Sequence, residues 1–197
     1  MKKVFAILLA SLCLLTAFCG CGKKEDDDSP YLKGKHHVEI DVKDYGVIAV
    51  ELDADTAPIS VTNFIMLANE GFYDGLTFHR VMSGFMIQGG DPDHNGTGGS
   101  PNHIRGEFEA NGVKNDISHV RGVISMARAN DYNSASSQFF IVHEDSTFLD
   151  GSYAAFGWVT SGMEVVDAIC QDTPVIDDNG TVPPSFQPVI TAIRVVD

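Results

Sequence analysis

Near the middle of the chain the sequence reads Phe78-His79-Arg80-Val81-Met82-Ser83-Gly84-Phe85-Met86-Ile87-Gln88-Gly89-Gly90-Asp91. Short strands are expected over residues 77–81 and 85–88. Taken singly, its residues have ordinary explanations, since an arginine in a strand is usually a surface ion pair, and Phe and Met are usually core residues. Gln88 before two glycines is often only a turn. The joint occurrence of these residues in one short run is what points to a functional site.

Two later segments extend this pattern. The first reads Gly122-Val123-Ile124-Ser125-Met126-Ala127-Arg128-Ala129 and continues through Ser136-Ser137-Gln138-Phe139-Phe140-Ile141. The second reads Phe148-Leu149-Asp150-Gly151 and is followed by Phe156-Gly157. Together with the first run, these segments resemble the active-site segments of the cyclophilins, a family of peptidyl-prolyl cis/trans isomerases, in the family's order and at its spacing. The resemblance covers residues 37–197.

The resemblance implies an eight-stranded antiparallel closed β-barrel capped by two α-helices. It also implies an isomerase that acts on X-Pro bonds of polypeptides and uses no cofactor and no metal ion. The expected catalytic residues are Arg80, Gln88 and Phe85. The residues expected to bind the substrate are Met86, Ala127, Arg128, Ala129, Gln138, Phe140, Phe148, Leu149 and Tyr153.

Two positions depart from the best-studied eukaryotic members of the family. Phe148 stands where those proteins have tryptophan, and Tyr153 stands where they have histidine. Both changes are familiar from bacterial cyclophilins, so the resemblance narrows to a bacterial type. Because Phe148 has no indole N–H donor, the resemblance does not extend to tight binding of cyclosporin.

The chemistry of an X-Pro bond explains why such residues would suffice. Rotation about a peptide bond has a barrier of about 18–20 kcal/mol, because the nitrogen lone pair is delocalised into the carbonyl. The two X-Pro isomers therefore exchange over roughly tens to hundreds of seconds. Catalysis requires groups that bind the twisted bond better than the planar one. An apolar pocket for the proline ring and a cation that favours a localised lone pair meet that requirement.

The residues of the three segments supply both parts. Phe85, Met86, Phe140 and Leu149 would form the apolar pocket, and Arg80 would be the cation, with a planar fork that stays charged at any working pH. Further groups would hold the substrate: the Gln88 side chain on its backbone, the backbone edge at Ala127–Ala129 beside the extended peptide, and the Tyr153 hydroxyl at the rim.

Hydrophobic periodicity gives an independent prediction of the elements. Alternation over residues 37–42 and 46–52, around Lys43-Asp44-Tyr45-Gly46, predicts a β-hairpin. Further strands are expected near residues 122–127, 138–142, 153–160 and 189–196. Many short strands with two helices in one domain suggest a closed or nearly closed β-barrel.

The first helix should follow the hairpin. Asp55 or Thr56 is the expected cap, with Pro58 in the first turn and Gly71 at the end. Its buried face would consist of Val61, Phe64, Ile65 and Ala68. The second helix is expected over residues 164–170, with a buried face of Val165, Val166 and Ile169.

The N-terminus has the form of a bacterial lipoprotein signal. Lys2 and Lys3 precede an apolar run over residues 4–18 that is short for a membrane span, and a retained anchor helix is the alternative. Phe18-Cys19-Gly20-Cys21 resembles a lipobox, with cleavage after residue 20 and lipidation of Cys21. The sequence thus divides into a signal peptide at 1–20, a flexible acidic tether at 21–35 and an isomerase domain at 36–197. We expect an extracytoplasmic protein, anchored to the membrane of the bacterial cell envelope through this lipid alone.

Charge and cysteine content narrow the partners. The chain carries 27 Asp and Glu against 13 Lys and Arg, a net charge of −14. Such a surface argues against nucleic acid and against docking on anionic lipid. Cys170 alone would remain in the domain, so neither a disulfide within the domain nor a cysteine metal site is expected there. It sits in an apolar helical pattern and is expected in the core, and we expect a monomer.

Two patterns imitate metal sites. Asp91-Pro92-Asp93-His94-Asn95-Gly96 looks like the start of an EF-hand loop, but the twelfth position falls on Asn102 where that loop needs a bidentate Glu. We interpret residues 91–103 as a glycine-rich surface loop, with weak calcium binding as the alternative. The seven histidines lack ligand spacing.

Two other functions are compatible with the sequence. The same fold could serve as a proline-peptide binding or chaperone module whose isomerase activity is incidental. A ligand-binding lipoprotein associated with a transporter rests only on the anchor, and the chain lacks the two-lobe length of that class.

Overall fold

The chain opens with the hairpin that its alternation predicted. The computed structural model describes residues 29–197, and in it β1 (Lys35–Val42) pairs antiparallel with β2 (Gly46–Asp53) over their whole length. The other strands are β3 (Phe78–Met82), β4 (Met86–Gly89), β5 (Val123–Met126), β6 (Phe139–Val142), β7 (Ala155–Ser161) and β8 (Ile190–Val195). The helices are α1 (Pro58–Asn69) and α2 (Met163–Asp172), with short 3₁₀ turns at Glu109–Asn111, Thr147–Leu149 and Pro184–Phe186.

The strands form one curled sheet that stays open, which corrects the prediction of a closed barrel. Its order is β3-β4-β6-β5-β7-β2-β1-β8, so β3 and β8 are its two edges. Across the opening lies one isolated bridge, Thr77 with Val189. Backbone bonds beside it run from the Phe78 N–H to the Pro188 carbonyl at 2.9 Å, from the Ile190 N–H to the Leu76 carbonyl at 2.8 Å and from the Gly75 N–H to the Ile190 carbonyl at 2.8 Å. Pro188 has no N–H to donate in return, so a regular ladder cannot continue past it.

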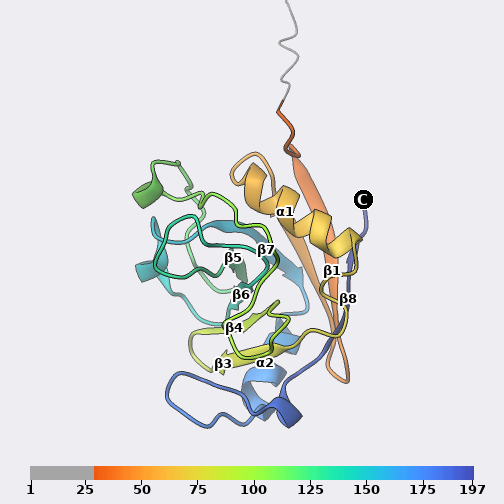
Figure 1. Ribbon diagram of the computed structural model, residues 1–197. Helices are drawn as coiled ribbons and strands as arrows, with labels where there is room; N and C mark the ends of the chain where they lie inside the picture. Colours follow the sequence, from red (N-terminus) through yellow and green to blue (C-terminus); the bar gives the residue numbers. More distant parts are fainter. Residues whose placement is uncertain (1–28) are drawn as a thin grey trace, which may run out of the picture.

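The two helices cover opposite ends of this sheet (Figure 1). α1 packs against β8 and β2, whereas α2 packs against β2, β3 and β4. The predicted buried faces of both helices are confirmed. Cys170 of α2 lies partly buried against the core, and burial raises the pKa of its thiol to about 12, so it stays protonated at neutral pH.

The start of α1 differs from the prediction. Neither Asp55 nor Thr56 caps it, because the cap position is Ala57. Both of their N–H groups instead donate to the Asp53 carboxylate, at 3.0 and 3.1 Å, and build the turn before the helix. The end is as predicted, with Gly71 in a left-handed conformation at φ 68°.

The last residues of the predicted tether belong to the folded domain. The Leu32 N–H donates to Thr62 Oγ1 at 2.8 Å, the Gly34 N–H donates to Asp55 Oδ1 at 2.8 Å, and Lys35 begins β1. The predicted signal peptide and the rest of the tether, residues 1–28, lie outside the described residues. Within residues 29–197 no helix has both the length and the apolar character that a membrane crossing requires.

Alternation along the strands separates two apolar clusters. In β6, Phe139 and Ile141 point into the main core beneath the helices. Phe140 and Val142 point to the opposite face, where they join a second cluster with Met86 of β4. The candidate site is built on this second cluster, outside the main core.

Candidate active site

The β3–β4 pairing brings Arg80 opposite Gln88. The two residues are direct partners in the ladder, and the Arg80 Nη1 donates to Gln88 Oε1 at 3.2 Å. The Arg80 Nε donates to the carbonyl of Asn179 at 2.7 Å, from a loop far along the chain. Partial burial lowers the pKa of the guanidinium from its usual range, yet arginine stays charged at working pH. Arg80 is therefore a cation held in a defined orientation.

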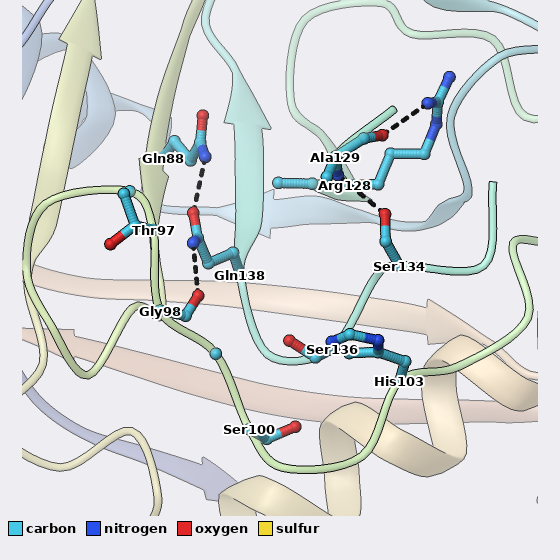
Figure 2. A pocket seen from close by; sticks show the side chains of 13 residues that line it. Gln88, Thr97, Gly98, Ser100, His103, Arg128, Ala129, Ser134, Ser136 and Gln138 are labelled. Atoms are coloured by element: carbon cyan, nitrogen blue, oxygen red, sulfur yellow. Dashed lines mark hydrogen bonds between the residues drawn. The ribbon is translucent and has the colours of Figure 1, made fainter. Parts of the chain in front are cut away.

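A chain of side-chain amides continues from Arg80. Gln88 Nε2 donates to Gln138 Oε1 at 2.9 Å, and Gln138 Nε2 donates to the Gly98 carbonyl at 2.7 Å (Figure 2). Each amide has a defined orientation because it accepts at its oxygen and donates at its nitrogen. The chain fixes Gln88 between the cation and the loop that carries Gly98.

A small pocket of about 170 Å³ opens beside Arg80, and we call it the Arg80 pocket. It brings together most of the predicted site residues from four separate segments. Its lining residues are Arg80, Phe85, Met86, Gln88, Ala127, Arg128, Phe140, Leu149 and Tyr153. Its apolar wall is largely buried, with residue exposures of 1% for Met86, 4% for Phe140 and 8% for Leu149. The guanidinium carbon of Arg80 lies 5.9 Å from the centre of the Phe85 ring, so the cation sits beside an apolar hollow.

A larger hollow of about 500 Å³ adjoins the first, and we call it the Gln138 pocket (Figure 2). The predicted residues Gln138 and Ala129 lie here, and Gln88, Ala127 and Arg128 border both pockets. Its other lining residues were not predicted from the sequence; they are Gly96, Thr97, Gly98, Gly99, Ser100, His103, Ser134 and Ser136.

For the lining residues that were not predicted, the sequence signal is the glycine content of the predicted surface loop over residues 91–103. Gly98 and Gly99 do not have positive φ angles; they are glycines because of close approach. A Cβ on Gly98 would collide with the carboxylate of Asp91, and one on Gly99 would collide with the hydroxyl of Ser136. The two glycines therefore let a loop lie flat against two polar side chains and form one wall of the pocket.

Asp91, the first residue of the EF-hand-like stretch, organises that loop. Its side chain is fully buried and accepts the N–H groups of Asp93 at 2.8 Å, Asn95 at 3.1 Å and Gly96. Backbone donors thus occupy the carboxylate oxygens. In the described part of the chain, no group of three or more His, Cys, Asp or Glu residues is arranged to hold a metal ion.

Phe148 and Ala129 lie differently from the rest of the predicted site. Phe148 is 74% exposed and lines neither pocket, although its ring centre lies 5.6 Å from that of Phe85 at the rim. The Ala129 N–H donates to Ser134 Oγ at 2.9 Å, and its carbonyl accepts from Arg128 Nη1 at 2.9 Å. Both polar backbone groups of Ala129 are thus engaged within the chain, and the Ala127 N–H donates to the Gln138 carbonyl at 3.0 Å. These three groups are therefore not available for pairing with a peptide.

Behind the apolar wall lies a buried histidine that the sequence did not single out. The ring of His119 stacks on Phe140 with centres 6.0 Å apart, and its Nδ1 lies 2.8 Å from Asp150 Oδ1. The His119 Nε2 lies 3.0 Å from the Ser125 hydroxyl. Burial lowers the pKa of His119, so it is neutral at physiological pH and supports both Phe140 and the segment that carries Leu149.

Comparison with known proteins agrees with this geometry. A family model described as cyclophilin type peptidyl-prolyl cis-trans isomerase/CLD matches residues 37–195. Peptidyl-prolyl cis-trans isomerase B of Bacillus subtilis is 50% identical over 123 residues, which cover 62% of this chain and 82% of that protein. The peptidyl-prolyl cis-trans isomerase of Helicobacter pylori is 48% identical over 128 residues, which cover 64% of this chain and 76% of that protein.

A solved structure supports the same assignment. The crystal structure of a cyclophilin type peptidyl-prolyl cis-trans isomerase from Cryptosporidium parvum, determined in the presence of the dipeptide Ala-Pro, superposes with a TM-score of 0.72. The two sequences are 30% identical, and the match covers 82% of this chain and 99% of the other. The chain therefore belongs to the cyclophilin-type peptidyl-prolyl cis-trans isomerases, an enzyme family.

Proposed function

We propose that this enzyme isomerises X-Pro bonds by binding the proline ring in the Arg80 pocket and placing the Arg80 guanidinium beside the twisted amide. The observation that carries the proposal is the fixed cation at the edge of a buried apolar wall. The relative from Cryptosporidium parvum, solved in the presence of Ala-Pro, supports a proline-containing ligand.

Each part of the pocket has a role in this mechanism. Met86, Phe140 and Leu149 bury the proline ring and hold it while the rest of the peptide turns. As the bond twists, the nitrogen lone pair localises, and the guanidinium N–H groups interact with it better than with the planar amide. Gln88 holds the guanidinium in plane and remains close enough to the pocket to contact the substrate backbone. The mechanism uses no covalent intermediate, because only rotation about the bond is required.

The test is a matched set of arginine variants assayed on an Ala-Pro peptide by protease-coupled or NMR exchange measurements. We expect Arg80→Ala to lower kcat/KM by about a hundredfold, the scale for loss of one positioned transition-state donor. We expect Arg80→Lys to recover only part of the loss, because an ammonium lacks the planar fork. Arg194→Ala, a surface variant whose residue pairs with Glu39 and Asp41, serves as the control and should match the wild type.

Two outcomes would contradict the proposal. A folded Arg80→Ala protein with the wild-type rate would remove the proposed role of the guanidinium. A wild-type protein no faster than the uncatalysed reaction would favour a proline-peptide binding or chaperone module instead. Thermal unfolding of each variant separates a loss of chemistry from a loss of fold.

We also propose that the enzyme is a lipoprotein of a bacterial envelope that assists exported proteins. The support is the N-terminal sequence: a basic start, a short apolar run and Cys21 after a small residue. The net charge of −14 opposes docking on anionic lipid, so attachment would come from the acyl chains.

Mass spectrometry of the mature N-terminus tests the anchor. We expect a diacylated or triacylated Cys21 as the first residue, and release of a Cys21→Ser protein from the membrane fraction. Cleavage at another position, or an unmodified Cys21 in the membrane fraction, would contradict the anchor and leave the isomerase assignment intact.

A further inference from the structure

Arg128 forms the ridge between the two pockets. It follows Ala127 just after β5, is half-buried, and lines both the Arg80 pocket and the Gln138 pocket. Figure 2 shows its side chain folded back so that the guanidinium meets the carbonyl of Ala129. A cation in this position could bind a charged group of the substrate or could hold parts of the groove in place. The contacts of the guanidinium distinguish these two roles.

Three aromatic rings surround the guanidinium. Its central carbon lies 5.2 Å from the ring centre of Phe108, 5.0 Å from that of Tyr132 and 4.7 Å from that of Tyr153. The rings come from three different segments of the chain, and Phe108 and Tyr132 also meet edge to face at 5.3 Å. A planar, weakly hydrated cation stacks on aromatic faces better than an ammonium does. The chain itself therefore occupies the faces of this cation.

Two carbonyls fix the plane of the group. The Arg128 Nε donates to the Ser152 carbonyl at 3.0 Å, and the Nη1 donates to the Ala129 carbonyl at 2.9 Å. The same Ala129 donates its N–H to Ser134 Oγ at 2.9 Å. Arg128 thus ties the segment before β7 to the loop after β5, on either side of the ridge.

Of the three rings around the Arg128 guanidinium, the Tyr153 ring also forms part of the wall of the Arg80 pocket. Tyr153, adjacent to Ser152, lines that pocket and meets Phe140 edge to face, with ring centres 5.9 Å apart and planes at 84°. Without the guanidinium, Tyr153 would lose the cation on one of its faces and the neighbouring carbonyl would lose its donor. The position of the Tyr153 wall therefore depends on Arg128.

We propose that Arg128 is a positioning residue, whose guanidinium holds Tyr153 and the Ala127–Ala129 ridge in place and so sets the affinity for peptides that cross from one pocket to the other. The inference rests on the proposed binding of the peptide in this groove. In this proposal only Arg80 acts on the twisted amide. Substitution of Arg128 therefore raises KM and leaves kcat nearly unchanged.

The test compares Arg128→Lys and Arg128→Met in the full-length protein. Lysine keeps the charge and methionine keeps an unbranched apolar stem, but neither has the planar fork. With an Ala-Pro peptide extended by several residues on both sides, we expect both variants to raise KM by about tenfold, the scale of one lost cation–π contact with its hydrogen bond, and to keep kcat within about twofold. Both should weaken the tyrosine signal in near-ultraviolet circular dichroism, because Tyr153 and Tyr132 lose a fixed neighbour.

Controls separate this role from a direct contact with substrate charge. Arg194→Lys, at an exposed position of β8, should keep the wild-type KM and spectrum. For an uncharged peptide, both Arg128 variants should still raise KM by about tenfold, and the wild-type KM should change little between about 0.05 and 0.5 M salt, since no substrate charge is involved. If thermal unfolding shows that the Arg128→Met protein does not fold, the KM and tyrosine spectrum of Arg128→Lys still test the proposal.

The outcomes are distinct. An Arg128→Lys protein with the KM and tyrosine spectrum of the wild type would overturn the proposal, because charge without the fork would then suffice. A fall in kcat at unchanged KM would also overturn it and place Arg128 in the twisting step. A wild-type protein without isomerase activity would overturn the proposed function instead, so failure of the inference and failure of the function are distinguishable.

Discussion

The sequence places Arg80 in a recognisable run, but it does not indicate all the contacts that orient the Arg80 side chain. The run from residue 78 to 91 identifies the arginine and its partner Gln88, since both lie in one hairpin. The carbonyl that holds its Nε belongs to Asn179, for which the sequence has no signal. The cation is predictable, whereas its orientation depends on a loop brought in by the fold.

Two buried histidines also have surroundings that the sequence does not indicate. His119 has partners in Asp150 and Ser125, while both ring nitrogens of the buried His79 have no hydrogen-bond partner in the described chain. Burial lowers the pKa of each ring. The absence of ligand spacing argued against a metal site, but it did not indicate which histidines would be buried.

The lowered pKa of His119 predicts a loss of stability in mild acid. Below pH 6.5, the usual pKa of histidine, the His119 ring binds a proton more readily in the unfolded chain than in the folded protein. The stability that its neutral form provides is therefore complete above this pH and declines as the pH falls. His79 acts in the same direction. For His119→Asn, which keeps a donor toward Asp150, we expect the urea midpoint to fall less between about pH 8 and pH 5.5 than in the wild type.

The measurement at the higher pH serves as its own control. Any destabilisation by the substitution itself appears there, where both rings are neutral in the folded and unfolded states. Equal pH dependence of the wild type and His119→Asn would show that this ring does not contribute.

At the level of elements, the N-terminus of α1 is capped by Glu107, a residue outside the helix and far from it in the sequence. The Glu107 carboxylate, 2% exposed, accepts the N–H groups of Ile59 at 2.9 Å and Ser60 at 2.8 Å, and also the Ser60 hydroxyl at 2.7 Å. The sequence predicted a local cap, because Asp and Thr precede the helix. The structure assigns those residues to a turn and gives the helix an anion that also suits its positive end.

This cap predicts a strong effect of one substitution. We expect Glu107→Ala to lower the free energy of unfolding by about 2–3 kcal/mol, since it removes a charged acceptor and leaves buried donors unpaired. Glu107→Gln should cost less because one acceptor oxygen remains. The measurement is urea unfolding followed by circular dichroism.

An exposed neighbour provides the control for this comparison. Glu109→Ala should change stability by no more than about 0.5 kcal/mol. Equal midpoints for Glu107→Ala and Glu109→Ala would contradict the capping role.

At the scale of the whole molecule, the folded unit begins earlier than residue 36. Leu32 packs against the main core, and hydrogen bonds from Leu32 and Gly34 join the segment to α1 and the turn before it. The charge run that suggested a flexible tether ends before these residues. The boundary is therefore set by contacts that composition does not record.

A truncation series tests that boundary. We expect a protein that begins at His36 to be less stable by about 2 kcal/mol than one that begins at Ser29, because it lacks the Leu32 packing and two backbone hydrogen bonds to side chains. The ion pair of Lys35 with Asp53 is partly exposed and adds little. Equal unfolding midpoints for the two proteins would place the boundary back at residue 36.

The family, the strands and the helices could be predicted from the sequence, because each rests on short segments or on local periodicity. The open edge between β3 and β8, the Glu107 cap, the Asn179 carbonyl on Arg80 and the aromatic rings around Arg128 could not. Apart from Tyr132, which is close to Arg128 in the sequence, these features join residues that lie about twenty to more than a hundred positions apart. Local propensity does not encode such contacts; they form only when packing of the sheet against its helices and loops brings the segments together.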